Sequence, residues 1–222
     1  MTRLPARYHI RLGVTGHRDL RGREAELRAL LQEHLHSGMR AAWDPGNAPW
    51  EGETSPILSY TILSPLAEGA DRLVAEEVLK TEGARLEVVL PMPAEDYELD
   101  FRTVVSKEKF RQLLAKAGKR HEIPGMARNP EMPAENAADS RVVAYKLAGR
   151  FVVDRCDLLI AIWDEKPPRN MAGTAAILEY ARGRLPVLVL SLRDVGIGFL
   201  LNEKLRLKPV QSHQSGSTAT LP

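Results

Sequence analysis

Short apolar runs alternate along this chain with stretches in which apolar residues recur at helical spacing. An apolar run of about five residues that ends at a turn predicts a buried strand, whereas apolar residues three and four apart predict a helix. The pattern predicts strands at 10–14, 57–63, 86–90, 121–123, 158–163 and 186–190, and helices at 22–40, from about 69, and at 103–117, 138–155 and 174–182.

Alternating strands and helices are typical of an α/β fold with a parallel sheet. The run Leu158–Trp163 is continuously apolar, as expected of a central strand that helices cover on both faces. We therefore predict a Rossmann-like three-layer sandwich whose central, mostly parallel sheet has about six strands. Residues 1–207 are predicted to form this single domain, and the polar segment 208–222 is predicted to be a disordered tail.

Composition removes several classes of function from consideration. The chain has 31 basic and 29 acidic residues, and its net charge of +2 is too small to predict a nucleic-acid or membrane partner. Its one cysteine excludes an internal disulfide and a multi-cysteine zinc site, and we predict no metal and no cofactor. The chain has no apolar run of about 18 residues and no secretory signal, so the expected location is the cytoplasm. A homo-oligomer is compatible with the sequence.

The residues that follow the predicted strands carry the candidate chemistry. In an open parallel sheet, ligands bind beyond the carboxyl ends of the strands, and three turns at this edge contain glycine. Glycine lets backbone N–H groups approach a ligand, a helix N-terminus favours phosphate, and arginine adds charge-assisted hydrogen bonds. The candidate ligand-binding residues are Gly16, His17, Arg18, Ser64, Gly69, Asp71, Arg72, Asp164, Gly173 and Thr174.

Each of these residues also has a simpler interpretation. Gly173 and Thr174 before a helix commonly form only a cap, and Arg72 on a first helical turn is commonly solvated. Their joint position at one edge nevertheless favours a site for a phosphate-bearing ligand. Neither Gly-x-Gly-x-x-Gly nor a Walker loop occurs, so the sequence lacks both standard phosphate-binding fingerprints.

Two aromatic residues and one acidic residue outside these turns also have a predicted role. Tyr97 and Phe101 are four residues apart, which predicts a packing pair, with a platform for base stacking as the alternative. Asp157 precedes a predicted strand at the opposite edge of the sheet, so we expect it to be structural.

The glycine-bearing turns resemble those of a known superfamily. Gly13-Val-Thr-Gly-His-Arg18, Ser64-Pro-Leu-Ala-Glu-Gly-Ala-Asp-Arg72 and Gly173-Thr174 are similar to motifs of the SLOG superfamily, which includes DNA-processing protein A and the Lonely Guy cytokinin-activating enzymes. The middle motif is the most specific, because DNA-processing proteins carry a similar Ser-Gly-x-Ala-x-Gly-x-Asp turn. The resemblance covers roughly Ile10–Ser191. It implies a Rossmann-like domain that binds a nucleotide or a nucleotide-derived signal, in many members as a ligand sensor.

The enzymatic branch of that superfamily has a motif from which this chain departs. Lonely Guy enzymes carry Pro-Gly-Gly-x-Gly-Thr-x-x-Glu, whereas this chain reads Asn170-Met-Ala-Gly-Thr-Ala-Ala-Ile177. Ile177 occupies the glutamate position, Glu179 lies about 200° round the helix from it, and Arg150 is about two positions from the place of the family's arginine. The sequence therefore favours a ligand-binding sensor, and it leaves any catalytic residue unassigned. The alternatives are a nucleoside-monophosphate N-glycosidase, that is, a phosphoribohydrolase, and a single-stranded DNA-binding module.

Overall fold

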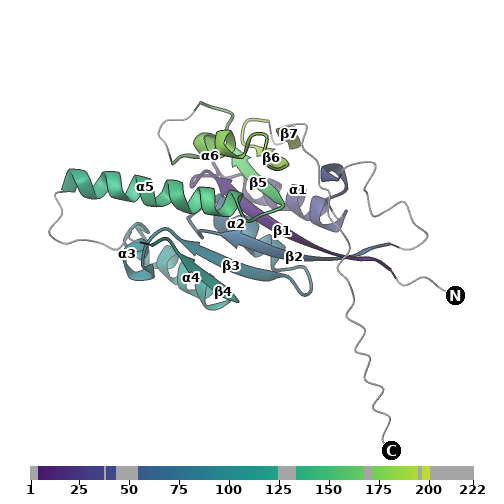
Figure 1. The fold of residues 1–222 in the computed structure, drawn as a ribbon, viewed down its shortest axis with the longest axis horizontal. Helices are drawn as coiled ribbons and strands as arrows, with labels where there is room; N and C mark the ends of the chain where they lie inside the picture. Colours follow the sequence, from purple (N-terminus) through teal and green to yellow (C-terminus); the bar gives the residue numbers. More distant parts are fainter. Residues whose placement is uncertain are drawn as a thin grey trace, which may run out of the picture.

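The computed structural model of the protein describes residues 5–37, 39–43, 55–124, 134–167, 172–194 and 197–200. Within them, one sheet contains seven strands in the order β4-β3-β2-β1-β5-β6-β7 (Figure 1). These strands are β1 Arg7–Gly16, β2 Ile57–Ser64, β3 Arg85–Leu90, β4 Lys119–Glu122, β5 Leu158–Trp163, β6 Val187–Ser191 and β7 Ile197–Leu200. The first six are parallel, and β7 pairs antiparallel with β6 at the edge.

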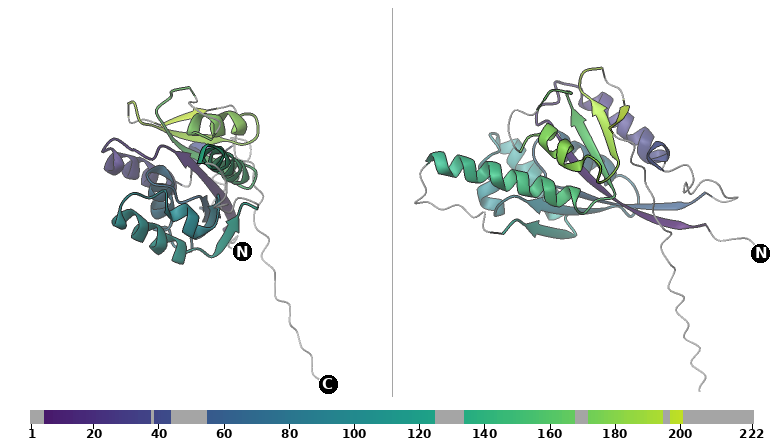
Figure 2. Two further views of the ribbon diagram at one scale, coloured as in Figure 1. Left: turned by 90° about the vertical axis from the view of Figure 1, so that its left-hand side faces the viewer. Right: turned by 45° about the horizontal axis from the view of Figure 1, so that its top comes forward.

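Helices cover both faces of this sheet. They are α1 Glu24–His36, α2 Ala70–Val78, α3 Ala94–Glu98, α4 Val104–Ala115, α5 Ala134–Val153 and α6 Thr174–Ala181, with a short 3-10 turn, η1, at Arg40–Ala42. Figure 2 shows α5 and α6 on one side of the sheet and α1, α2 and α4 on the other. The predicted Rossmann-like three-layer α/β sandwich is therefore confirmed.

The predicted elements agree with the structure best where the hydrophobic pattern is strong. The strand predicted at 158–163 has those bounds, and α5 begins four residues before the predicted start at 138. The edge strand β7 was not predicted, because four residues are too few to establish a period. The predicted tail, 208–222, lies outside the described residues.

Alternation along β1 places its side chains in two different environments. Ile10, Leu12 and Val14 belong to the core beneath α1 and α2. Gly13 is at a position of the opposite face, where a Cβ added to it would lie 2.7 Å from both the Cys156 sulfur and a Val152 methyl carbon. A glycine at this position therefore lets the end of α5 pack directly onto the central strand.

The strand order creates a topological switch point beside β1. This strand pairs with β2 on one side and with β5 on the other, and Gly16 is level with Ile162 of β5. Chain order runs outward from β1 to β4 and then crosses back to β5. At such a point the loops after the two adjacent strands separate in opposite directions, which opens a crevice beyond their carboxyl ends.

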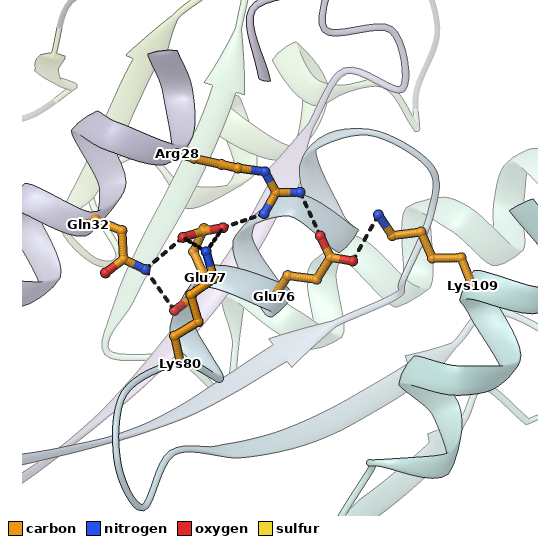
Figure 3. Close-up of polar contacts among 6 residues, drawn as sticks. All are labelled: Arg28, Gln32, Glu76, Glu77, Lys80 and Lys109. Carbon is orange, nitrogen blue, oxygen red and sulfur yellow. Dashed lines mark hydrogen bonds and ion pairs between the residues drawn. The ribbon is translucent and has the colours of Figure 1, made fainter. Parts of the chain in front are cut away.

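A network of charged side chains joins α1, α2 and α4 on one face of the sheet (Figure 3). It consists of Arg28, Gln32, Glu76, Glu77, Lys80 and Lys109. Glu77 is fully buried, and its carboxylate accepts hydrogen bonds from Arg28, Gln32 and Lys80. Burial alone would raise the pKa of Glu77, but these hydrogen bonds outweigh burial and lower the pKa. The buried carboxylate is therefore compensated, and α2 is held between its two neighbours.

Candidate functional site

A cleft of about 590 Å³ lies at the switch point. Its walls come from the loop after β1, the end of β5, the first turn of α6 and one face of α5. A volume of this size is within the range of pockets that hold small organic ligands.

The structure brings most of the predicted site residues to this cleft. Those that line it are Gly16, His17, Arg18, Asp71, Asp164, Gly173 and Thr174. The remaining three, Ser64, Gly69 and Arg72, lie behind the wall, where they shape it without lining it.

Asp164, directly after β5, organises the cationic side of the cleft. Its side chain is 4% exposed, and its carboxylate lies 2.9 Å from His17 Nε2, 2.8 Å from an Arg21 amino group and 3.6 Å from the Lys166 ammonium. Burial opposes ionisation of this carboxyl group, but the hydrogen bonds and charges around it, His17 first, lower its pKa. Asp164 is therefore a carboxylate at neutral pH that holds one imidazole and two cationic side chains at the rim.

Among the described cations that line the cleft, Arg18 has the longest ion-pair distance. Its guanidinium lies 4.0 Å from Asp100 and 5.7 Å from the centre of the Tyr145 ring. Its side chain is 44% exposed, and it makes no hydrogen bond to another described residue. Because few interactions would be lost, Arg18 can turn toward an anion in the cleft.

The first turn of α6 borders the same space. The Gly173 carbonyl accepts hydrogen bonds from the N–H groups of Ala176 and Ile177. The N–H groups of Thr174 and Ala175 have no acceptor within the described part of the chain, as expected for the start of a helix. Gly173 itself has φ −74° and ψ 165°, a conformation that any residue adopts. Its backbone therefore does not require glycine.

Gly69 and Ser64 maintain the shape of the β1 loop and the turn before α2. Gly69 has φ +77°, and a Cβ added there would lie 2.2 Å from the Arg18 carbonyl oxygen. The Ala70 N–H, next along the chain, donates to the His17 carbonyl at 3.0 Å. Ser64 Oγ donates to the Asp71 carbonyl and accepts from the Leu66 N–H. The backbone of the two cleft residues His17 and Arg18 is therefore packed directly against the start of α2.

The position of Arg72 corrects the expectation that its side chain is solvated or reaches an anion. The residue is 4% exposed. Its guanidinium donates to the Leu66 carbonyl at 2.9 Å and to the Ser106 hydroxyl at 2.8 Å, and it lies 4.3 Å from the centre of the Phe101 ring. The start of α4 lies close to the first turn of α2, so this arginine is enclosed and joins the two helices.

Asp71, the neighbour of Arg72, faces the cleft. It is 6% exposed, and its Oδ2 accepts a hydrogen bond of 3.2 Å from the Ala67 N–H. Burial raises the pKa of Asp71 to about 7, against the opposing effects of that hydrogen bond and of the Arg18 and Arg72 charges. The carboxyl group is therefore protonated in the folded protein over a pH range in which it is ionised in the unfolded chain.

This raised pKa predicts that Asp71→Asn stabilises the protein increasingly as the pH rises. A carboxyl group whose pKa is raised by folding lowers the stability progressively as the pH rises from its unfolded to its folded pKa, here from about pH 4 to about pH 7, and the full cost remains at higher pH. At about 1.4 kcal/mol per pKa unit, the variant should gain a few kcal/mol over the wild type across that range. Urea unfolding at about pH 5 and about pH 8 measures the difference, and an equal gain at both values would contradict the prediction.

Several cleft residues were not predicted as site residues. Arg21 and Lys166 follow the predicted turns by a few positions, and Tyr145 belongs to α5, which returns across the sheet from a distant part of the chain. Tyr97 forms the predicted packing pair with Phe101, with ring centres 5.1 Å apart, but it also lines the cleft. The sequence feature that could have identified Arg21 and Lys166 is their short distance along the chain from the ends of β1 and β5.

Asp157 has the predicted structural role. Its Oδ2 accepts a hydrogen bond of 2.7 Å from the Arg11 N–H, and this contact fixes the amino end of β5 against β1. In the described ranges, no group of three or more His, Cys, Asp and Glu side chains is arranged to hold a metal ion. None of the helices in these ranges has the length and apolar character needed to cross a membrane.

The fold and the cleft together define a Rossmann-like α/β domain with a ligand-sized crevice at its topological switch point. No model of a known protein family matches the chain, and no curated protein matches it.

Proposed function

We propose that the cleft binds a nucleotide or a nucleotide-derived signalling ligand, and that the protein acts as a ligand sensor. The observation that carries this proposal is the meeting of the α6 N-terminus with cationic side chains in one open cleft. Thr174 and Ala175 line the same space that Arg18 borders. Backbone donors at a helix N-terminus, supplemented by a partly exposed arginine, are a common arrangement for binding phosphate.

The proposal includes membership of the SLOG superfamily. Its support is the resemblance of the turns 13–18, 64–72 and 173–174, all of which lie at the carboxyl edge of the parallel sheet. All three turns contribute residues to the cleft wall, the turn 64–72 through Pro65, Ala67 and Asp71.

Binding without hydrolysis is favoured by the residues at the enzymatic positions. Ile177, at the glutamate position of the hydrolase motif, is 4% exposed and forms part of the cleft wall. Glu179 is 68% exposed and pairs with Arg182 on the outer side of α6. A phosphoribohydrolase would release free base and ribose phosphate from a nucleoside monophosphate. A single-stranded DNA-binding module would show an affinity that falls steeply with salt.

Replacing Arg18 tests the phosphate side of the proposal. The purified protein is examined by native mass spectrometry for a retained nucleotide, and the affinities of the four common nucleoside 5′-monophosphates are then measured by calorimetry. Arg18→Ala should weaken the tightest of them by roughly 10- to 150-fold, because one charge-assisted hydrogen bond is lost.

The matched control is Arg182→Ala, which removes an exposed arginine outside the cleft and should leave the affinity unchanged. Equal affinity of the Arg18→Ala variant and the wild type, or no binding of any nucleotide, would contradict the proposed function.

A further inference from the structure

The cleft extends to a second polar region, on the opposite side of β1 from α6. Asp164 and the start of α6 lie on the β5 side of the central strand, whereas Asp71 follows β2 and Tyr97 follows β3. Tyr145 of α5, which contacts both β1 and β3, covers this second region. We call Asp71, Tyr97 and Tyr145 the far end of the cleft.

Two buried polar groups at the far end have unused hydrogen-bonding capacity. Tyr97 is fully buried yet lines the cleft, and its hydroxyl makes no hydrogen bond to another described residue. Asp71 uses Oδ2 for the Ala67 N–H, but its Oδ1 makes no hydrogen bond within the described ranges. Burying a polar group without a partner is costly, so a ligand that supplies both partners gains affinity there.

The remainder of the far end suits a flat ring. The Tyr145 ring is half-buried, and its centre lies 6.1 Å from that of Tyr97. Val142, one helical turn before Tyr145, adds an apolar contact to the same wall. Aromatic and apolar side chains of this kind pack against the face of a heterocycle and leave its edge for polar groups.

We propose that the far end holds the base of the nucleotide, and that Asp71 and Tyr97 select a base with an amino group next to an unprotonated ring nitrogen, as in adenine and cytosine. This inference rests on the proposed function. At about pH 8, where Asp71 is ionised, its carboxylate accepts a hydrogen bond from the amino group, and the Tyr97 hydroxyl donates one to the ring nitrogen. Hypoxanthine and uracil present an oxo group and a ring N–H at these positions, so both interactions are lost.

Three phosphate compounds separate the contribution of the base from that of the phosphate. The probes are adenosine 5′-monophosphate, inosine 5′-monophosphate and ribose 5-phosphate, each measured by calorimetry. The adenine nucleotide should bind at least about tenfold more tightly than the other two, since a paired donor and acceptor are worth about 1–3 kcal/mol. The inosine nucleotide and ribose 5-phosphate should bind with similar affinities.

Tyr97→Phe tests the role of the hydroxyl without disturbing the packing. The phenylalanine ring keeps the contacts with Phe101 and Phe110, so the variant should fold with an unchanged melting temperature. Its affinity for the adenine nucleotide should fall about tenfold, while its affinity for ribose 5-phosphate stays the same. Tyr60→Phe, the same change at a buried tyrosine outside the cleft, should affect neither affinity.

Asp71→Asn provides an independent variant. Asparagine keeps an oxygen for the Ala67 N–H but offers the ligand a donor as well as an acceptor, so the preference for the adenine over the inosine nucleotide should disappear. Equal binding of all three probes to the wild type would overturn this inference and leave the proposed function standing. If both variants still prefer the adenine nucleotide, this inference is likewise overturned and the proposed function stands. If no probe binds, the proposed function itself fails.

Discussion

Gly69→Ala is expected to destabilise the protein by at least about 3 kcal/mol. Two effects combine at this position. The backbone has φ +77°, which costs a residue with a side chain about 1–2 kcal/mol. The new Cβ would also lie 2.2 Å from the Arg18 carbonyl oxygen and 2.4 Å from that of His17, so the β1 loop or α2 must move.

Gly83→Ala is the matched control for this prediction. Gly83 has nearly the same backbone angle, φ +73°, but an added Cβ meets nothing within 4 Å. Gly83→Ala should therefore lower the free energy of unfolding by only about 1 kcal/mol, the cost of placing a side chain on a backbone with positive φ. Urea unfolding of both variants measures the difference, and similar losses would mean that the close approach of α2 to the β1 loop is unimportant. The fraction of Gly69→Ala protein that still folds should also bind nucleotide more weakly than the wild type, because His17 and Arg18 are displaced.

Arg72→Ala is expected to lower the free energy of unfolding by about 3 kcal/mol or more. The substitution removes the hydrogen bonds to Leu66 and Ser106 and leaves the buried Leu66 carbonyl and the half-buried Ser106 oxygens without this donor. It also empties the space beside the Phe101 ring, over which the guanidinium lies. The loss should appear as a clear fall in melting temperature, together with weaker attachment of α4 to α2.

Arg182→Ala is the control for Arg72→Ala. Arg182 pairs with Glu179, and both side chains are more than half exposed, so its removal should cost less than about 1 kcal/mol. A melting temperature for Arg72→Ala as close to the wild type as that of Arg182→Ala would show that the buried contacts contribute little. In that case the earlier expectation of a solvent-facing Arg72 would be the better description.

The hydrophobic pattern was sufficient to predict the class of fold and the edge at which the cleft lies. Apolar period and turn residues act over a few neighbouring positions, so Leu158–Trp163 could be recognised as a buried strand without knowledge of the rest of the chain. Because every parallel strand ends at the same edge, the residues after β1 and β5 could be expected to meet. Gly16, His17, Asp164 and Gly173 were found at the cleft for this reason.

The direction and burial of individual side chains required the tertiary structure. Asp71 and Arg72 are adjacent on one helical turn, yet Asp71 faces the cleft and Arg72 contacts α4, a helix that begins more than thirty residues later. Likewise, Tyr145 reaches the cleft only because the chain between β4 and β5 returns across the sheet.

The sequence by itself therefore determined the six parallel strands, most of the helices and the edge that carries the cleft. Only the tertiary structure decided that Arg18 is a weakly held cation while Arg72 is enclosed, and that Gly69 fits against the backbone of the β1 loop. The physical reason is the range of the interactions. Secondary structure follows from neighbours within one or two turns, whereas burial and hydrogen bonding depend on segments that only the folded chain brings together.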